Sequence, residues 1–291
     1  MHVILAFDKI LLWFLLYSFI GWLWETCLNI VMKKRFVDRG ILNGPLCPIY
    51  GFGALLAIYA LPGEHSFLAL FLSSGVLACT LEYLTSWGIE KLFHMRLWDY
   101  TNKPFNINGR VYLNGFIFFG LGCTVIKLWV QPHVAELCDA IDPTTLIAVS
   151  TTLLVITLVD AVITFGSLIS MNSRLGHVES DIKSLKQRGI AHIDVGITAA
   201  DAHVEAAGAR FNAATDGLGT RVGDKVHDAG ERVRDASDQF SAHVHDLFSL
   251  QQRRLIDAYP QMRTTHDPHL LKEVRAQFAK YRERRAPHTS H

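Results

Sequence analysis

Long apolar runs dominate the first part of the chain, and short polar loops separate them. Five runs stand out: Phe7–Met32, Leu46–Leu61, Phe67–Ile89, Val111–Val130 and Thr144–Ser170. A helix of about 20 mostly apolar residues crosses the hydrocarbon core of a bilayer. The pattern therefore predicts an all-α protein, with five transmembrane helices over residues 1–173.

The second run is the weakest of the five, because it is short and its start is crowded with Gly44, Pro45, Pro48, Gly51 and Gly53. Proline is tolerated in the first turn of a helix, so a short or broken helix that begins at Pro48 fits. A re-entrant segment is the alternative. It would move every later loop to the opposite side of the membrane.

Basic residues alternate from loop to loop in phase with the five runs. The loops after the first, third and fifth runs carry Lys33, Lys34, Arg35 and Arg39, then Lys91, Arg96, Lys103 and Arg110, then Arg174, Lys183, Lys186 and Arg188. The loop after the second run has no Lys or Arg, and the loop after the fourth is mainly acidic. The positive-inside rule then places the N-terminus outside and the long tail in the cytoplasm, which opposes the re-entrant alternative.

Carboxylates lie inside three of the runs, where ionisable groups are costly and tend to mark function. In this topology Glu25, Glu82 and Asp160 lie roughly 10–15 Å from the cytoplasmic ends of their helices, at 1.5 Å per residue. Asn114 lies just inside the fourth helix. The simplest interpretation is a polar cavity open to the cytoplasm. The alternative is a set of structural ion pairs with loop arginines, although the sequence indicates no partner for Asp160.

Two cytoplasmic loops add directed polar groups, and we expect them to cap this cavity. Both mix glycine, asparagine and aromatic residues with one arginine, Arg39 or Arg110, that is suited to an anionic or polar ligand. Trp98 and Tyr100 alone would be ordinary interfacial anchors. The candidate binding or pore residues are Glu25, Arg39, Asn43, Tyr50, Glu82, Trp98, Asp99, Tyr100, Asn106, Arg110, Asn114 and Asp160.

Four ordered motifs make the chain resemble a known family. They read YSFIGWLWE at 17–25, RGILNGPLCPIYG at 39–51, LEYL at 81–84 and WDY followed by NINGR at 98–110. They resemble a bacterial family of ABC-transporter permeases, called type IV or CmpB-like, over roughly residues 7–170. The resemblance implies a subunit of the bacterial cytoplasmic membrane that works with a separate ATPase.

The tail is polar, with apolar residues at helical spacing over 174–259. Such stripes predict amphipathic helices that bury their apolar faces by coiled-coil pairing, which would form a homo-oligomer, or by antiparallel folding within one chain. A last region, 260–291, is expected to form a short helix with a basic end. That end either touches anionic lipid or is a solvated terminus.

Composition excludes several classes of function. With 28 Lys and Arg against 27 Asp and Glu, the net charge of +1 gives no argument for nucleic acid. Neither the five cysteines nor the histidines have the spacing of a metal site. The sequence also lacks the GxxxxGK[ST] motif through which many proteins bind ATP. We therefore expect no cofactor or metal in this chain, with ATP supplied only through a partner subunit.

Three functions remain open at this point, and no catalytic residue is assigned. The first, favoured by the resemblance, is a permease subunit. The second is a membrane-embedded enzyme that acts on a lipid or lipid-linked phosphate, with Glu25 or Glu82 as general base. The third is a membrane scaffold or sensor whose tail recruits partners.

Overall fold

The computed structural model describes residues 2–34, 36–64, 66–187, 234–265 and 267–285. These residues are mostly helical and divide into two compact units. The first unit contains Met1–Ser170 and Leu250–His266, and the second contains Met171–Ser249 and Asp267–His291. The expected division at 1–173, 174–259 and 260–291 stays a prediction, although the first unit takes in a piece of the tail.

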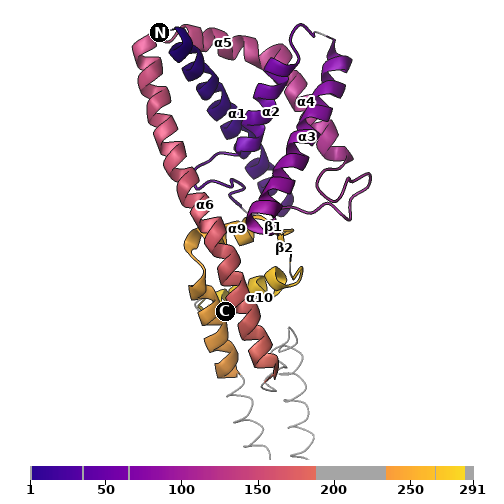
Figure 1. The fold of residues 1–291 in the computed structure, drawn as a ribbon, viewed down its shortest axis with the longest axis vertical. Coiled ribbons are helices and arrows are strands. Elements are labelled where there is room, and N and C mark those ends of the chain that lie inside the picture. The colour runs from indigo at the N-terminus through magenta and orange to yellow at the C-terminus, as the bar shows by residue number, and fades with distance from the viewer. Residues whose placement is uncertain (1, 35, 65, 188–233, 266, 286–291) are drawn as a thin grey trace, which may run out of the picture. The chain divides into compact units, whose positions relative to one another are not determined.

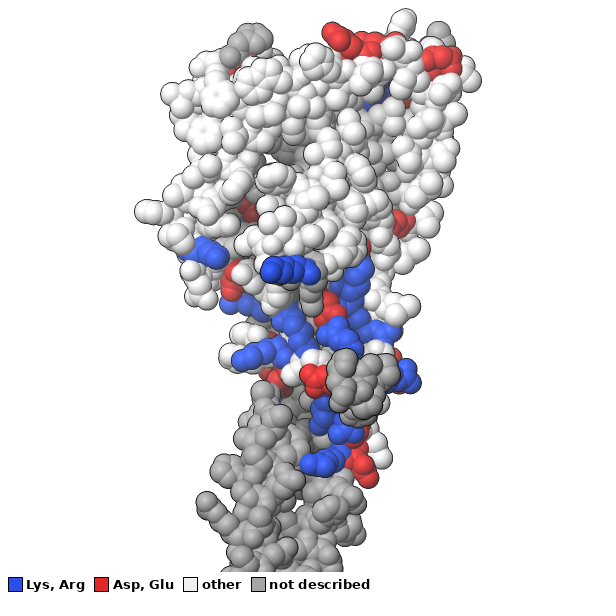
Figure 2. Space-filling view, turned by 180° about the vertical axis from the view of Figure 1, so that it is seen from behind, with Lys and Arg blue, Asp and Glu red and all other residues white. Residues whose placement is uncertain are grey.

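The first unit is built from long apolar helices, which are drawn in Figure 1. Their bounds are α1 His2–Lys33, α2 Pro48–Ala60, α3 Phe67–Phe93, α4 Leu113–Val125, η1 Ile126–Val130, α5 Gln131–Asp139 and α6 Pro143–Gln187. Among the described residues, four helical segments are long and apolar enough to cross a membrane: His2–Met32, Phe67–Phe93, Leu113–Asp139 and Pro143–Ser184. Figure 2 shows a broad, mostly uncharged surface over these helices, as contact with lipid requires.

Four of the five expected transmembrane helices thus have a counterpart, and the count of five is not confirmed. The exception is α2, which begins at Pro48 and has 13 residues. At 1.5 Å per residue it is about 20 Å long, which is less than the roughly 30 Å of a hydrocarbon core. The Lys127 ammonium donates to the Ile58 carbonyl at 3.0 Å and so satisfies one of the last carbonyls of this short helix.

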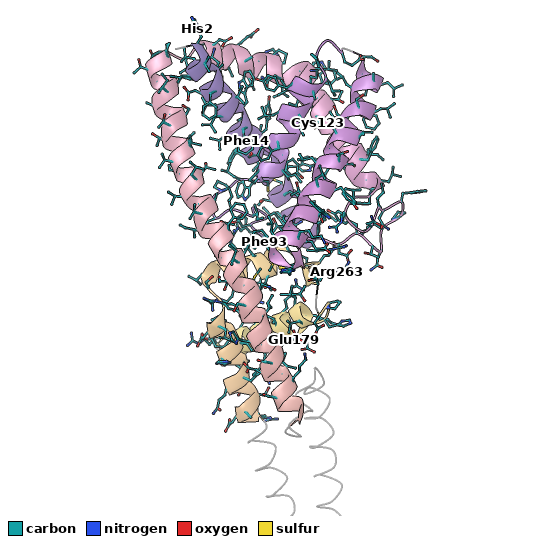
Figure 3. All side chains as sticks on the ribbon, in the orientation of Figure 1. His2, Phe14, Phe93, Cys123, Glu179 and Arg263 are labelled. Atoms are coloured by element: carbon teal, nitrogen blue, oxygen red, sulfur yellow. The ribbon has the colours of Figure 1, made fainter. Side chains whose placement is uncertain are left out.

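Glycines allow these helices to pack closely. A methyl group on Gly51 of α2 would lie 2.5 Å from the Phe14 carbonyl of α1. In the same way, Gly120 of α4 lies against α3, because its side chain would start 2.8 Å from the Phe71 carbonyl. Phe14 packs on Phe52, and the Cys123 thiol contacts the Gly53 carbonyl, so α1 and α4 both touch α2 (Figure 3).

The fourth expected run continues past Val130 with a change of helical type. Residues Ile126–Val130 form a π-helical turn, and Pro132 follows in the first turn of α5. A proline inside an α-helix clashes with the carbonyl four residues before it, here that of Leu128. The wider π turn accommodates that carbonyl, so the helix continues through Pro132.

Residues from the tail complete the first unit. Helix α9, Leu250–Ala258, is followed by β2, Arg263–Thr264, which pairs antiparallel with β1, Met95–Arg96. This two-stranded sheet is an addition to the expected all-α fold. A strand of two residues is too short to show the alternation of apolar and polar residues by which a strand is recognised in a sequence.

The second unit has its own apolar core. It contains the end of α6, helical residues 234–247 and α10, Leu270–Arg285, close to the short basic helix expected there. Buried side chains include Met171, Leu175, Val244, Leu271 and Phe278. The expected stripe over residues 200–222 lies outside the described residues, and coiled-coil pairing stays a prediction.

Candidate functional site

Three polar side chains, joined by one hydrogen bond and one ion pair, link α1, α2 and the loop between them. The Tyr50 hydroxyl donates to Glu25 Oε1 at 2.7 Å, and Arg39 Nε lies 3.5 Å from Glu25 Oε2. Gly21 makes this possible, because a side chain there would overlap with the Tyr50 ring. One turn of helix separates Gly21 from Glu25, so both face α2. Glu25 is therefore a paired, half-buried carboxylate.

Other residues of the 17–25 motif hold α1 against neighbouring elements. Tyr17 donates to Gln131 Oε1 at 2.6 Å, and the Ser18 carbonyl accepts the Cys47 N–H at 3.0 Å. Trp22 Nε1 donates to Asp38 Oδ1 at 2.7 Å. The Tyr17 contact fixes α1 against α5, and the other two fix it against the first loop. They explain why this motif mixes polar and aromatic residues inside a membrane helix.

Glu82 is the second carboxylate of the site, and it is only 4% exposed. Its Oε2 atom has no hydrogen-bond partner among the described residues. Gly115 of α4 leaves room for it, because a side chain on Gly115 would begin 3.4 Å from Oε2. Unlike Glu25, Glu82 forms no ion pair with any described residue.

Two loop tyrosines lie close enough to both carboxylates to be influenced by their charge. Burial raises the pKa of Tyr100, and the nearby Glu82 and Glu25 carboxylates raise it further, while Arg39 opposes them. The same order of causes, burial and then Glu82 and Glu25, raises the pKa of Tyr112. The Tyr100 and Tyr112 rings lie 4.5 Å apart. Both phenols therefore stay neutral and offer hydrogen-bond donors between two acids.

The tail contributes to this site through α9 and the residue after it. Arg39 Nη1 donates to the Ala258 carbonyl at 2.6 Å, and its guanidinium lies 5.0 Å from the centre of the Tyr259 ring. The Tyr259 hydroxyl in turn donates to the Arg39 carbonyl at 2.8 Å. Nearby, burial and then Glu25 raise the pKa of the Cys47 thiol to about 12, so that it stays protonated.

Arg254 of α9 holds the first loop in shape. Its Nη1 donates to Asp38 Oδ2 at 2.6 Å and to the Gly40 carbonyl at 3.0 Å, and its Nη2 donates to the Leu42 carbonyl at 2.7 Å. A guanidinium suits this role because it offers five donors in a planar fork. Arg254, Asp38 and Tyr259 were not among the expected site residues, since partners more than 200 positions apart leave no signal in one sequence.

Asp160 has a partner that the sequence did not indicate. Its carboxylate accepts the backbone N–H groups of Asn43 and Gly44, at 3.0 and 2.7 Å, and the Asn43 side chain at 2.8 Å. Thr164, one turn along α6, adds a fourth donor at 3.2 Å. Asn43 and Asp160 therefore tie the first loop to α6 and form a contact separate from that of Glu25 and Glu82.

Arg110 forms an ion cluster with Glu90 and Arg96, and not with Glu25 or Glu82. It is 7% exposed, and its Nη2 lies 2.9 Å from Glu90 Oε2, which Arg96 also contacts. Its Nη1 donates to Ser86 Oγ at 3.3 Å. The sequence suggested that Arg39 or Arg110 could pair with Glu25 or Glu82. Among the described residues, Arg39 pairs with Glu25 and Arg110 pairs with neither acid.

The remaining candidates of the second loop shape the loop itself. Trp98 Nε1 donates to the Arg110 carbonyl at 3.0 Å, and Asp99 pairs with Arg263 of β2 at 3.0 Å. Asn106 accepts the Gly109 N–H at 3.0 Å, and Gly109 has a φ of +67°, which favours glycine. Asn114 is exposed in the first turn of α4 and lies outside these clusters.

The structure thus brings five of the twelve candidates together: Glu25, Arg39, Tyr50, Glu82 and Tyr100. We call this set, with Tyr112, the acidic site. It offers two carboxylates against one guanidinium, together with neutral phenols. No group of three His, Cys, Asp or Glu residues suited to a metal ion occurs in the described part of the chain.

Four apolar helices of membrane-spanning length, with buried carboxylates between them, define a polytopic membrane protein. A family model described as "Putative ABC-transporter type IV" matches residues 12–165, and the chain belongs to this family. No curated protein and no solved structure matches the chain. The matched residues include every residue of the acidic site, whereas α9 and β2 lie beyond them.

Proposed function

We propose that this protein is the permease subunit of an ABC-type transporter, with the acidic site as part of its substrate path. The observation that carries the proposal is the buried Glu82 carboxyl group, which forms no ion pair with any described residue, near Glu25 in a membrane domain of this family. A carboxyl group buried there is costly, and such residues in membrane helices tend to mark function. We further propose that the short α2 forms a fifth, partial span that lines the path.

The proposed orientation has the N-terminus outside and the tail in the cytoplasm. Acidic side chains gather at the end of the first unit that carries α5, and basic side chains gather at the opposite end (Figure 2). The positive-inside rule assigns the basic end to the cytoplasm. The two loops that build the acidic site, 34–47 and 94–112, lie at that end and form the proposed docking surface for a separate ATPase, the only source of ATP in the proposal.

The arginines weigh against the alternative of an enzyme that acts on a lipid-linked phosphate. Such an enzyme needs a guanidinium that is available to hold the phosphate. Arg39 is engaged by Glu25, Ala258 and Tyr259, and Arg110 by Glu90 and Ser86. Both are therefore occupied within the protein, which favours transport.

Co-purification tests the proposal. Tagged full-length protein, extracted from its native host in mild detergent, is expected to retain an ATPase at a fixed ratio by mass spectrometry. Lys103→Glu, on an exposed position of the second loop, should weaken this association. Glu136→Lys, which reverses charge at the opposite end, is the matched control and should not. Purified protein without any ATPase, from cells that contain the full set of host proteins, would contradict the proposal.

A further inference from the structure

The acidic site contains two carboxyl groups, Glu25 and Glu82, but only one cation, Arg39. Arg39 is paired with Glu25 at 3.5 Å, which leaves Glu82 without a counter-charge among the described residues. Tyr100 and Tyr112 contribute hydroxyl donors but no charge. A buried carboxylate without a cation favours a ligand that brings a positive charge.

Arg110, the other arginine considered as a partner for Glu82, is held elsewhere. Arg110 lies against Ser86, one turn beyond Glu82, and its charge is directed to Glu90 at 2.9 Å. Its guanidinium lies 5.4 Å from the centre of the Tyr83 ring, which further fixes its position. Arg110 therefore belongs to the Glu90 cluster and does not provide a counter-charge for Glu82.

An apolar groove of about 460 Å³ runs along α3, α4 and the second loop. This volume is typical of small-molecule sites. Its lining includes Val76 and Phe116 of the helices and Phe105, Ile107 and Tyr112 of the second loop. Phe105 and Ile107 are 81% and 60% exposed, so loop residues offer apolar surface beside the membrane helices. An alkyl chain can lie in such a groove without displacing any polar contact.

The groove and Glu82 meet at Tyr112. Tyr112 lines the groove, and its Cδ1 atom lies 3.8 Å from the point where a Gly115 side chain would begin. Glu82 Oε2 lies 3.4 Å from the same point. The Tyr112 ring therefore lines the groove close to a carboxylate oxygen that has no hydrogen-bond partner among the described residues.

We propose that the protein binds an amphiphilic amine, with its ammonium group at Glu82 and its alkyl chain in the groove between α3 and α4. The proposal rests on the proposed transport function and names the class of substrate for its path. Ligand binding needs no ATPase, so the two proposals fail separately. A missing ATPase would leave amine binding intact, and a missing amine site would leave the ATPase complex intact.

Photolabelling of full-length protein in phosphatidylcholine vesicles tests the charge preference. The probe is dodecylamine with a diazirine on its alkyl chain, and mass spectrometry locates the label. We expect label on α3 and α4 peptides that line the groove. Unlabelled dodecylamine should compete well, whereas dodecanol and dodecanoate should compete at least about tenfold more weakly, because they bring no cation to Glu82.

Two pairs of measurements on variants separate the parts of the site. Glu82→Gln should weaken labelling by dodecylamine about tenfold while labelling by a dodecanol probe is unchanged. Val76→Trp should block the groove, whereas Leu72→Trp, on an exposed position of α3 outside the groove, should not. Equal competition by the three amphiphiles on the unaltered protein, or stronger competition by dodecanoate, would overturn the proposal even if every variant failed to fold.

Discussion

At the scale of single residues, the hydroxyl of Tyr50 stabilises the Glu25 carboxylate within a membrane helix. It donates to Glu25 at 2.7 Å, where the carboxylate is half-buried and Arg39 Nε is 3.5 Å away. A hydrogen bond to a charged group contributes more than a bond between neutral groups. Glu25 therefore depends on Tyr50 as well as on Arg39.

Removing only this oxygen measures the dependence. We expect Tyr50→Phe to lower the free energy of unfolding by about 1–3 kcal/mol, because it leaves a carboxylate oxygen without its donor. Thermal unfolding in detergent provides the measurement. Tyr59→Phe is the matched control, because Tyr59 lies on the same helix and is 52% exposed. Equal effects of the two changes would contradict the role given to Tyr50.

At the scale of elements, two glycines of α2 face very different surroundings. A side chain on Gly51 would lie 2.5 Å from the Phe14 carbonyl, whereas one on Gly53 would first meet Leu81 at 3.9 Å. We expect Gly51→Ala to force α1 and α2 apart and to cost about 1–3 kcal/mol. Gly53→Ala should cost nothing, since it makes ordinary contacts and alanine favours a helix. Comparison of the two melting temperatures checks this.

Helix α9 is the element that links the tail to the first loop. Arg254→Ala removes the donor of Asp38 and of the Gly40 and Leu42 carbonyls, and we expect it to cost about 2–3 kcal/mol. Arg254→Lys should restore part of this, because lysine keeps the charge but loses the planar fork. Unfolding curves give both values. Leu250→Ala, at an 80% exposed position of α9, is the control. Complete rescue by lysine would show that charge alone holds the loop.

At the scale of the whole molecule, the side of the membrane reached by the loop after α2 decides the topology. A fifth span places this loop outside, and a re-entrant segment places it in the cytoplasm. We expect Glu64→Cys, in a chain without its five natural cysteines, to react with an impermeant thiol reagent added to intact cells. Lys103→Cys should react only after the cells are opened. Reaction of both from the same side would contradict the proposed topology.

The family and the membrane helices could be recognised from the sequence, because both are encoded locally. An apolar run long enough to cross a bilayer is visible without any partner, and motifs such as 17–25 are contiguous. The carboxylates within the runs were also visible, since their positions along the helices follow directly from the sequence. The short α2 was also evident, because Pro48 marks its first turn.

Only the tertiary structure decided which polar groups meet. Glu25 pairs with Arg39, but Arg110 pairs with Glu90, and sequence order offers no rule that separates these choices. Asp160 accepts the backbone N–H groups of Asn43 and Gly44. Almost every residue has such a group, so the residue types do not reveal which ones will donate. Arg254 and Tyr259 reach the first loop across more than 200 residues. A hydrophobic run consists of consecutive residues and can be seen in the sequence, whereas the packing of the helices determines which residues become partners in a buried polar site.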